Sequence, residues 1–192
     1  MLIVGLGGTL RAGSTCESAL RIALDEAMRH GVRTACFAGP QLRMPMYDPA
    51  DPDRTPEAQA LLAALRRADG VIVASPGYHG SISGLVKNAL DYTEDMARDP
   101  RSYFDDLPVG CIATGFGSQA AMTTIDALRA VTHALRGWPT PFAAAISVRA
   151  GLFAEEGCTD ATVEAQLRTV GRQVAQAVRR RHAAETELAR SV

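Results

Sequence analysis

Short apolar runs alternate with amphipathic segments along the chain, and this alternation constrains the fold more than any other feature of the sequence. The runs expected to form β-strands are residues 2–6, 32–37, 71–75, 109–114 and 142–148. Apolar residues at helical spacing predict helices that end at 30, begin at 55, span 83–92, end at 136 and cover 163–178. This alternation predicts an α/β fold, in which a doubly wound, five-stranded parallel sheet lies between two helical layers.

The chain has 192 residues, of which 47% are hydrophobic. This length suits one well-packed domain and is too short for two domains that each have a large core. We expect the domain to cover residues 1–178 and a polar C-terminal tail to cover 179–192. The basic stretch at 179–182 is expected to be a solvated helix end, favourable to the helix dipole, rather than a nucleic-acid patch.

Charge and composition argue against nucleic acid and membrane partners. Lys and Arg total 20 and Asp and Glu total 21, a net charge of -1, whereas proteins that bind phosphate backbones are usually basic. Aromatic residues make up 5% of the chain, too few to favour a stacking platform for single strands. No apolar stretch is long enough to span a bilayer, and residues 1–8 lack the features of a signal peptide, so a cytoplasmic protein is expected.

The 4 cysteines, at 16, 36, 111 and 158, show neither disulfide-framework nor zinc-ligand spacing, and no metal site is predicted. Cys36 and Cys111 lie in apolar runs and are expected to be small buried hydrophobic residues.

In a doubly wound sheet, ligands bind beyond the carboxyl ends of the strands, where three loops of this chain are expected to meet. The first loop runs from Gly7 to Cys16 into a helix and offers free N–H groups, hydroxyls and Arg11. It approaches the Walker pattern, but Ser14 stands in place of the lysine that binds nucleoside triphosphates. A terminal monophosphate therefore matches better, and an ordinary Gly/Ser turn is the alternative.

The second loop follows the third expected strand, and its Pro76, two glycines and Tyr78 could lie flat beneath a planar ligand. His79 is expected to have a positioning or structural role rather than that of a general base. Lys87 and Asp91, four residues apart on the next helix, predict an ion pair.

The third loop spans residues 114–119 and is a glycine turn into a helix. It offers hydroxyl, amide and backbone donors together with one ring, that of Phe116.

With these loops, the chain resembles the NAD(P)H-dependent FMN reductases of the flavodoxin-like superfamily, over roughly residues 2–175. The family's phosphate loop, G-S-L-R-x-x-S-x-N, corresponds to GTLRAGSTC at 8–16. Its segment P-x-Y-N-G-x-x-P-G-x-L-K-N-x-x-D corresponds to PGYHGSISGLVKNALD at 76–91. The resemblance implies a flavodoxin-like sheet with strand order 2-1-3-4-5.

The resemblance also implies an FMN site built from all three loops. The residues expected to hold the 5′-phosphate are Thr9, Arg11, Ser14, Thr15 and Cys16. The ring system is expected between Pro76, Gly77, Tyr78, His79 and Ser81 on one side and Thr114, Gly115, Gly117, Ser118 and Gln119 on the other. Tyr78 and His79 are expected to line the opening for the nicotinamide of NADPH or NADH.

The activity implied by the resemblance is hydride transfer from NAD(P)H to FMN, with reduced FMN supplied to a flavin-dependent monooxygenase as partner. The cofactor carries this chemistry, so no side chain is expected to act as base or nucleophile. Two alternatives stay open: a reductase that keeps its FMN and reduces quinones, azo compounds or another small acceptor, and a non-enzymatic electron carrier like flavodoxin. The net charge of -1 and Arg11 disfavour the carrier, because flavodoxins are strongly acidic. Members are commonly homodimers or homotetramers.

Four positions depart from the family pattern. Cys16 stands where Asn is common, Gly77 where Glu is frequent, His79 where Asn is frequent and Ser83 where Pro is frequent. These changes affect the expected contacts of the rings and of the subunits more than the fold.

Overall fold

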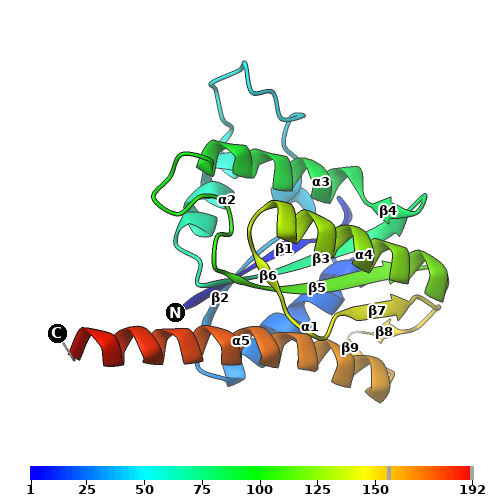
Figure 1. Ribbon diagram of the computed structural model, residues 1–192. Coiled ribbons are helices and arrows are strands. Elements are labelled where there is room, and N and C mark those ends of the chain that lie inside the picture. The colour runs from blue at the N-terminus through cyan, green and yellow to red at the C-terminus, as the bar shows by residue number, and fades with distance from the viewer. Residues whose placement is uncertain (155–156, 191–192) are drawn as a thin grey trace.

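The computed structural model describes residues 1–154 and 157–190, which form a central parallel sheet between two layers of helices (Figure 1). The strands lie in the order β2 (Arg33–Ala38), β1 (Leu2–Gly7), β3 (Gly70–Tyr78), β5 (Pro108–Gly115) and β6 (Trp138–Pro139), and β7 (Ala144–Ser147) also pairs with β5. Taking β6 and β7 as the fifth strand position, this is the expected flavodoxin-like order 2-1-3-4-5, which is confirmed.

Each face of the sheet is covered by its own helices and has its own apolar core. On one face, α1 (Thr15–Arg29) and α5 (Ala161–Arg190) pack with Ile72 and Ile112, and Figure 1 shows these two helices together below the sheet. On the other face lie α2 (Pro56–Arg66), α3 (Gly84–Asp91) and α4 (Ser118–Ala134), which pack on Val73 and Val109. Such two-sided burial explains why the strands are continuous apolar runs rather than alternating ones.

Hydroxyl caps fix the start of three helices. The side chains of Ser14, Thr55 and Ser83 accept the backbone N–H groups of the third residues of α1, α2 and α3. Pro56 stands at the first position of α2, where the φ angle fixed by its ring already suits a helix. The helix start expected at residue 55 is therefore confirmed.

The remaining elements are short. Two 3₁₀ turns, η1 (Gly39–Leu42) and η2 (Tyr92–Met96), follow β2 and α3, and β8 (Phe153–Ala154) pairs with β9 (Gly157–Cys158). None of the helices formed by the described residues has the length and apolar character needed to cross a membrane.

Three expectations differ from the structure. Strand β3 continues to Tyr78 and forms an antiparallel hairpin with β4 (Ser81–Ile82), so residues 76–78 are not a loop. The last helix does not end at 179–182 but continues to Arg190, so the described part of the expected tail is helical and mostly exposed. Residues 191–192 lie outside the described residues. Cys36 is half-buried because β2 is an edge strand, whereas Cys111 is buried as expected.

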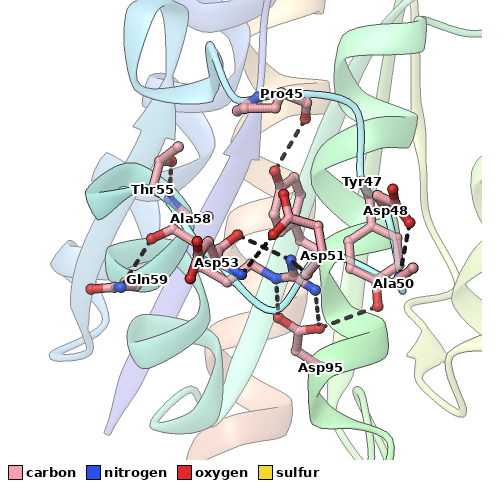
Figure 2. A network of polar contacts seen from close by, with 12 residues as sticks. Pro45, Tyr47, Asp48, Ala50, Asp51, Asp53, Thr55, Ala58, Gln59 and Asp95 are labelled. Carbon is pink, nitrogen blue, oxygen red and sulfur yellow. Dashed lines mark hydrogen bonds and ion pairs between the residues drawn. The ribbon is translucent and has the colours of Figure 1, made fainter.

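A polar cluster fastens the long segment between η1 and α2 to the body of the protein (Figure 2). The Arg54 guanidinium donates to both carboxylate oxygens of Asp95, with Nε–Oδ2 at 2.6 Å and Nη2–Oδ1 at 3.0 Å. It also lies over the rings of Tyr47 and Tyr92, with 5.0 and 5.6 Å to their centroids. The Tyr92 hydroxyl donates to the Pro45 carbonyl, so the segment is held at both ends.

We expect Asp95→Asn to lower the free energy of unfolding at pH 7 by about 1 kcal/mol, since the paired charges are partly exposed. The Arg54 guanidinium lowers the pKa of Asp95 below its ordinary value of 3.8, so the carboxylate stabilises the fold at neutral pH. This stabilisation is lost as the pH falls through the lowered pKa. Urea unfolding at pH 7 and below that pKa should therefore show a deficit that disappears in acid. Asp126→Asn, on an exposed part of α4, is the control, and an equal deficit at both pH values would contradict the prediction.

Candidate functional site

The carboxyl ends of β1, β3 and β5 open into one cleft of about 230 Å³. The residues that line it come from all three expected ligand loops: Thr9, Arg11, Ser14, Thr15, Cys16, Pro76, Gly77, Tyr78, Thr114, Gly115, Phe116 and Val148. The cleft is smaller than most ligand pockets, whose volumes are roughly 300–1,000 Å³. A ligand of nucleotide size would fill it and extend over its rim.

One wall of the cleft is the N-terminus of α1 with the loop before it. The first backbone N–H groups of the helix, those of Thr15 and Cys16, have no acceptor within the helix and favour an anion. Arg11 lines this wall and adds a positive charge. The Thr9 hydroxyl accepts the Arg11 backbone N–H at 3.3 Å, so it also shapes the loop.

Cys16 lies buried on this wall, where the related family commonly has Asn. Burial raises the pKa of its thiol to about 12, although the Thr114 hydroxyl and the Gly8 backbone act in the opposite direction. The thiol is therefore protonated at neutral pH and adds no negative charge beside the anion-binding N–H groups.

The opposite part of the cleft is formed by β3, by the loop after β5 and by the end of β7. Two rings stand at its rim, Tyr78 with 51% and Phe116 with 92% of the residue exposed. Phe116 was noted in the sequence but not among the expected cofactor contacts. Val148 was missed, and it reaches the cleft because its N–H bonds to the Gly115 carbonyl at 2.8 Å. No local sequence signal marks that pairing.

Five of the expected site residues do not line this cleft. Gly117, Ser118 and Gln119 line a neighbouring hollow of about 460 Å³, shared with Gly80 and Phe116. His79 and Gly80 form the turn of the β3–β4 hairpin with positive φ angles of 51° and 84°, and the His79 side chain is exposed. Ser81 lies on β4, where its carbonyl accepts the Thr124 hydroxyl. The expectation that residues 76–80 form a loop is therefore wrong for 76–78, which belong to β3, and neither His79 nor Ser81 is among the residues that line the cleft.

Gly77 explains one departure from the family pattern. A Cβ atom at this position would lie 2.5 Å from the Thr124 hydroxyl oxygen and 2.9 Å from the Ala120 carbonyl oxygen. Helix α4 therefore packs so closely on β3 that the frequent Glu of the family would not fit without a shift of that helix.

Helix α3 carries the polar end of the second motif. Lys87 and Asp91 form the expected ion pair on its surface. Asn88 instead faces inward: it accepts the Tyr47 N–H at 2.8 Å and donates to the Pro45 carbonyl at 2.8 Å. This asparagine therefore holds the segment that Arg54 also fastens.

The donors on the α1 wall fit a phosphate monoester. Helix N–H groups, the hydroxyls of Thr9, Ser14 and Thr15 and one guanidinium suit a compact dianion, and the protonated Cys16 does not oppose it. Beyond them, Pro76, Gly77 and Gly115 offer backbone next to an open, partly aromatic surface for a planar group. Fold and site together define an α/β protein of the flavodoxin-like class with a cleft at the carboxyl edge of the sheet, one wall of which offers donors for an anion.

The family model described as NADPH-dependent FMN reductase matches residues 1–151, and the chain belongs to this family. Curated relatives include the NADPH azoreductase of Bacillus sp. (strain OY1-2), 32% identical over 88 residues, which are 45% of this chain and 46% of that protein. The FMN-dependent NADPH-azoreductase of Staphylococcus aureus (strain USA300) is 36% identical over 74 residues, 38% of this chain and 36% of that protein. The matched regions thus span less than half the length of these relatives.

Solved structures share the fold across nearly the whole chain. FerB, a flavoenzyme NAD(P)H:(acceptor) oxidoreductase from Paracoccus denitrificans, superposes with a TM-score of 0.73 at 20% identity, covering 93% of this chain and 97% of that one. The apo form of the NADH:FMN oxidoreductase EMOB gives a TM-score of 0.68 at 21% identity, covering 91% and 88%. A flavodoxin from the domain Archaea gives 0.63 at 8% identity, covering 93% and 99%.

Proposed function

We propose that this protein is an FMN-binding, NAD(P)H-dependent oxidoreductase. The observation that carries the proposal is the cleft, where the α1 N-terminus and Arg11 offer a phosphate-monoester site beside an open surface flanked by two exposed rings. Membership of the NADPH-dependent FMN reductase family supports the same ligand and the same hydride donor.

In this proposal, Arg11, Ser14 and Thr15 hold the FMN phosphate together with the first N–H groups of α1. The backbone at Gly77 and Gly115 lies beside the ring system. When bound, FMN supplies the ability to accept a hydride from NADPH or NADH and to pass the electrons to an acceptor. The protein's part is to bind and orient, so no side-chain base or nucleophile is required.

The open rim leaves room for a second planar molecule. Tyr78 and Phe116 are exposed at two sides of the cleft and offer apolar surface to the nicotinamide donor or to an acceptor. Exposed rings of this kind are also suited to burial by a second copy of the chain, and a homodimer or homotetramer is part of the proposal.

Two acceptors are proposed. The first is FMN itself, released after reduction for use by a flavin-dependent monooxygenase. The second is an azo compound, quinone or similar small acceptor reduced by a protein that retains its FMN. The azoreductase names of the two curated relatives favour this second candidate. An electron carrier is less well supported, because 20 basic residues nearly balance 21 acidic ones.

The test is anaerobic absorption spectroscopy of the purified protein mixed with FMN and then with NADPH or NADH. We expect FMN to bind and its visible absorption to be bleached by at least one of the nucleotides. Flavin that co-elutes with the protein on gel filtration, together with decolorisation of an azo dye, would favour the second acceptor. Turnover that depends on added, freely separable FMN would favour the first. If FMN neither binds nor is bleached, the proposal is wrong.

A further inference from the structure

Glu17 is a carboxylate packed behind the phosphate loop rather than in the cleft. It lies in the first turn of α1, and its side chain is 9% exposed. One of its oxygens, Oε2, accepts the backbone N–H of Gly13 at 3.0 Å. Because Gly13 directly precedes the Ser14 cap, this bond ties the end of the loop to the first turn of α1.

The second carboxylate oxygen of Glu17 is engaged by one cation. Arg21, one turn further along α1, donates to Oε1 from Nε at 2.9 Å and from Nη2 at 2.7 Å. The two oxygens therefore accept from different groups: Oε2 from the loop and Oε1 from the guanidinium. The Oε2 atom also lies 3.5 Å from where a Cβ of Gly39 would stand, so the carboxylate lies close to the start of η1.

A buried negative charge next to a site for a phosphate dianion has an electrostatic cost. Like charges that are close together and poorly hydrated repel each other. Gly13 N–H and Arg21 offset this cost, because both donate hydrogen bonds to the carboxylate. Glu17 thus holds the loop through its hydrogen bond to Gly13, and Arg21 keeps the net charge of the pair close to zero.

We propose that Glu17 is a positioning residue for the phosphate of the bound flavin, and that Arg21 makes its charge compatible with that phosphate. The inference rests on the proposed function, since it concerns the FMN phosphate site. Glu17 acts through the loop: with Gly13 fixed, the hydroxyls and N–H groups at 14–16 are held ready for the phosphate.

The first test compares FMN with riboflavin, which lacks the phosphate, by flavin fluorescence quenching. We expect Glu17→Ala to raise the Kd for FMN about tenfold, the effect of losing one hydrogen bond to a charged group. The Kd for riboflavin should change by less than about twofold, because its rings do not depend on the loop. Glu17→Gln keeps an oxygen for the Gly13 N–H and should retain FMN affinity within about twofold.

The second test uses Arg21, which is largely exposed and whose loss leaves the core intact. Arg21→Ala should raise the Kd for FMN about fivefold in the natural background, because it leaves the Glu17 charge uncompensated near the phosphate. In the Glu17→Gln background the same change should have a smaller effect, since no carboxylate then holds the exposed guanidinium close to the loop. Thermal unfolding of each variant establishes that it is folded.

The outcomes separate the inference from the proposed function. Wild-type protein that binds FMN, with Glu17→Ala binding it equally tightly, overturns the inference alone. Equal losses of affinity for FMN and riboflavin in Glu17→Ala would show that the pair is merely structural and would overturn the inference. An effect of Arg21→Ala that is the same in both backgrounds would overturn it as well. Wild-type protein that binds neither FMN nor inorganic phosphate overturns the proposed function and the inference with it.

Discussion

Replacing Arg11 with alanine is expected to weaken FMN binding by about 30-fold, the range expected for hydrogen bonds between a guanidinium and a phosphate. Arg11 lines the cleft beside the N-terminus of α1, and its side chain is exposed. Its loss should therefore change the free energy of unfolding by less than about 0.5 kcal/mol. Titration of the protein with FMN, followed by flavin fluorescence, measures the Kd directly.

The salt dependence of the same titration adds a second readout. The wild-type affinity should fall as salt is added, and the Arg11→Ala affinity should fall less steeply, because one charge contact with the phosphate is missing. Arg180→Ala, which removes an exposed arginine of α5, is the matched control and should leave the affinity unchanged. An unchanged Kd in Arg11→Ala would mean that the phosphate binds elsewhere.

Gly171→Ala is expected to cost about 2–3 kcal/mol of stability, which lowers the melting temperature by roughly 5–10 °C in a domain of this size. A Cβ at Gly171 would lie 2.0 Å from the carbonyl oxygen of Ala23, so α5 and α1 touch through their backbones. The methyl group would force these helices apart on one whole face of the sheet. The higher helix propensity of alanine, about 1 kcal/mol, offsets part of this cost.

Gly84→Ala is the matched control for that change. Gly84 is the first residue of α3, and a Cβ there would meet nothing within 4 Å. It should be neutral or stabilising by up to about 1 kcal/mol, because alanine loses less backbone entropy on folding. Calorimetry measures the melting temperatures of both variants. Equal melting temperatures for Gly171→Ala and the wild type would show that α1 and α5 can shift without loss of stability.

Much of the architecture is predictable from the sequence because its signals are local. The continuous apolar runs of β1, β3 and β5 indicate strands covered on both faces, and Thr55 marks a helix start by its capping chemistry. The hydroxyls, glycines and Arg11 before α1 likewise indicate an anion site, since they lie within one short loop. In the structure the hydroxyls and Arg11 line one wall of the cleft.

The sequence was less informative wherever distant segments meet. The β3–β4 hairpin, whose turn holds His79 outside the cleft lining, depends on backbone pairing, whereas the sequence pattern alone predicts a loop there. The role of Asn88, which faces the segment at 45–47, depends on where that segment packs.

By itself, then, the sequence determined the alternation of strands and helices, the cap chemistry and the donors of the phosphate loop, because each rests on residues close together in the chain. Only the tertiary structure decided which side chains complete the cleft. Val148 enters it through a hydrogen bond to Gly115, and Gly77 is required because α4 lies against it. The physical reason is that burial and contact depend on what packs from the other side, and periodicity along one segment carries no information about its neighbour.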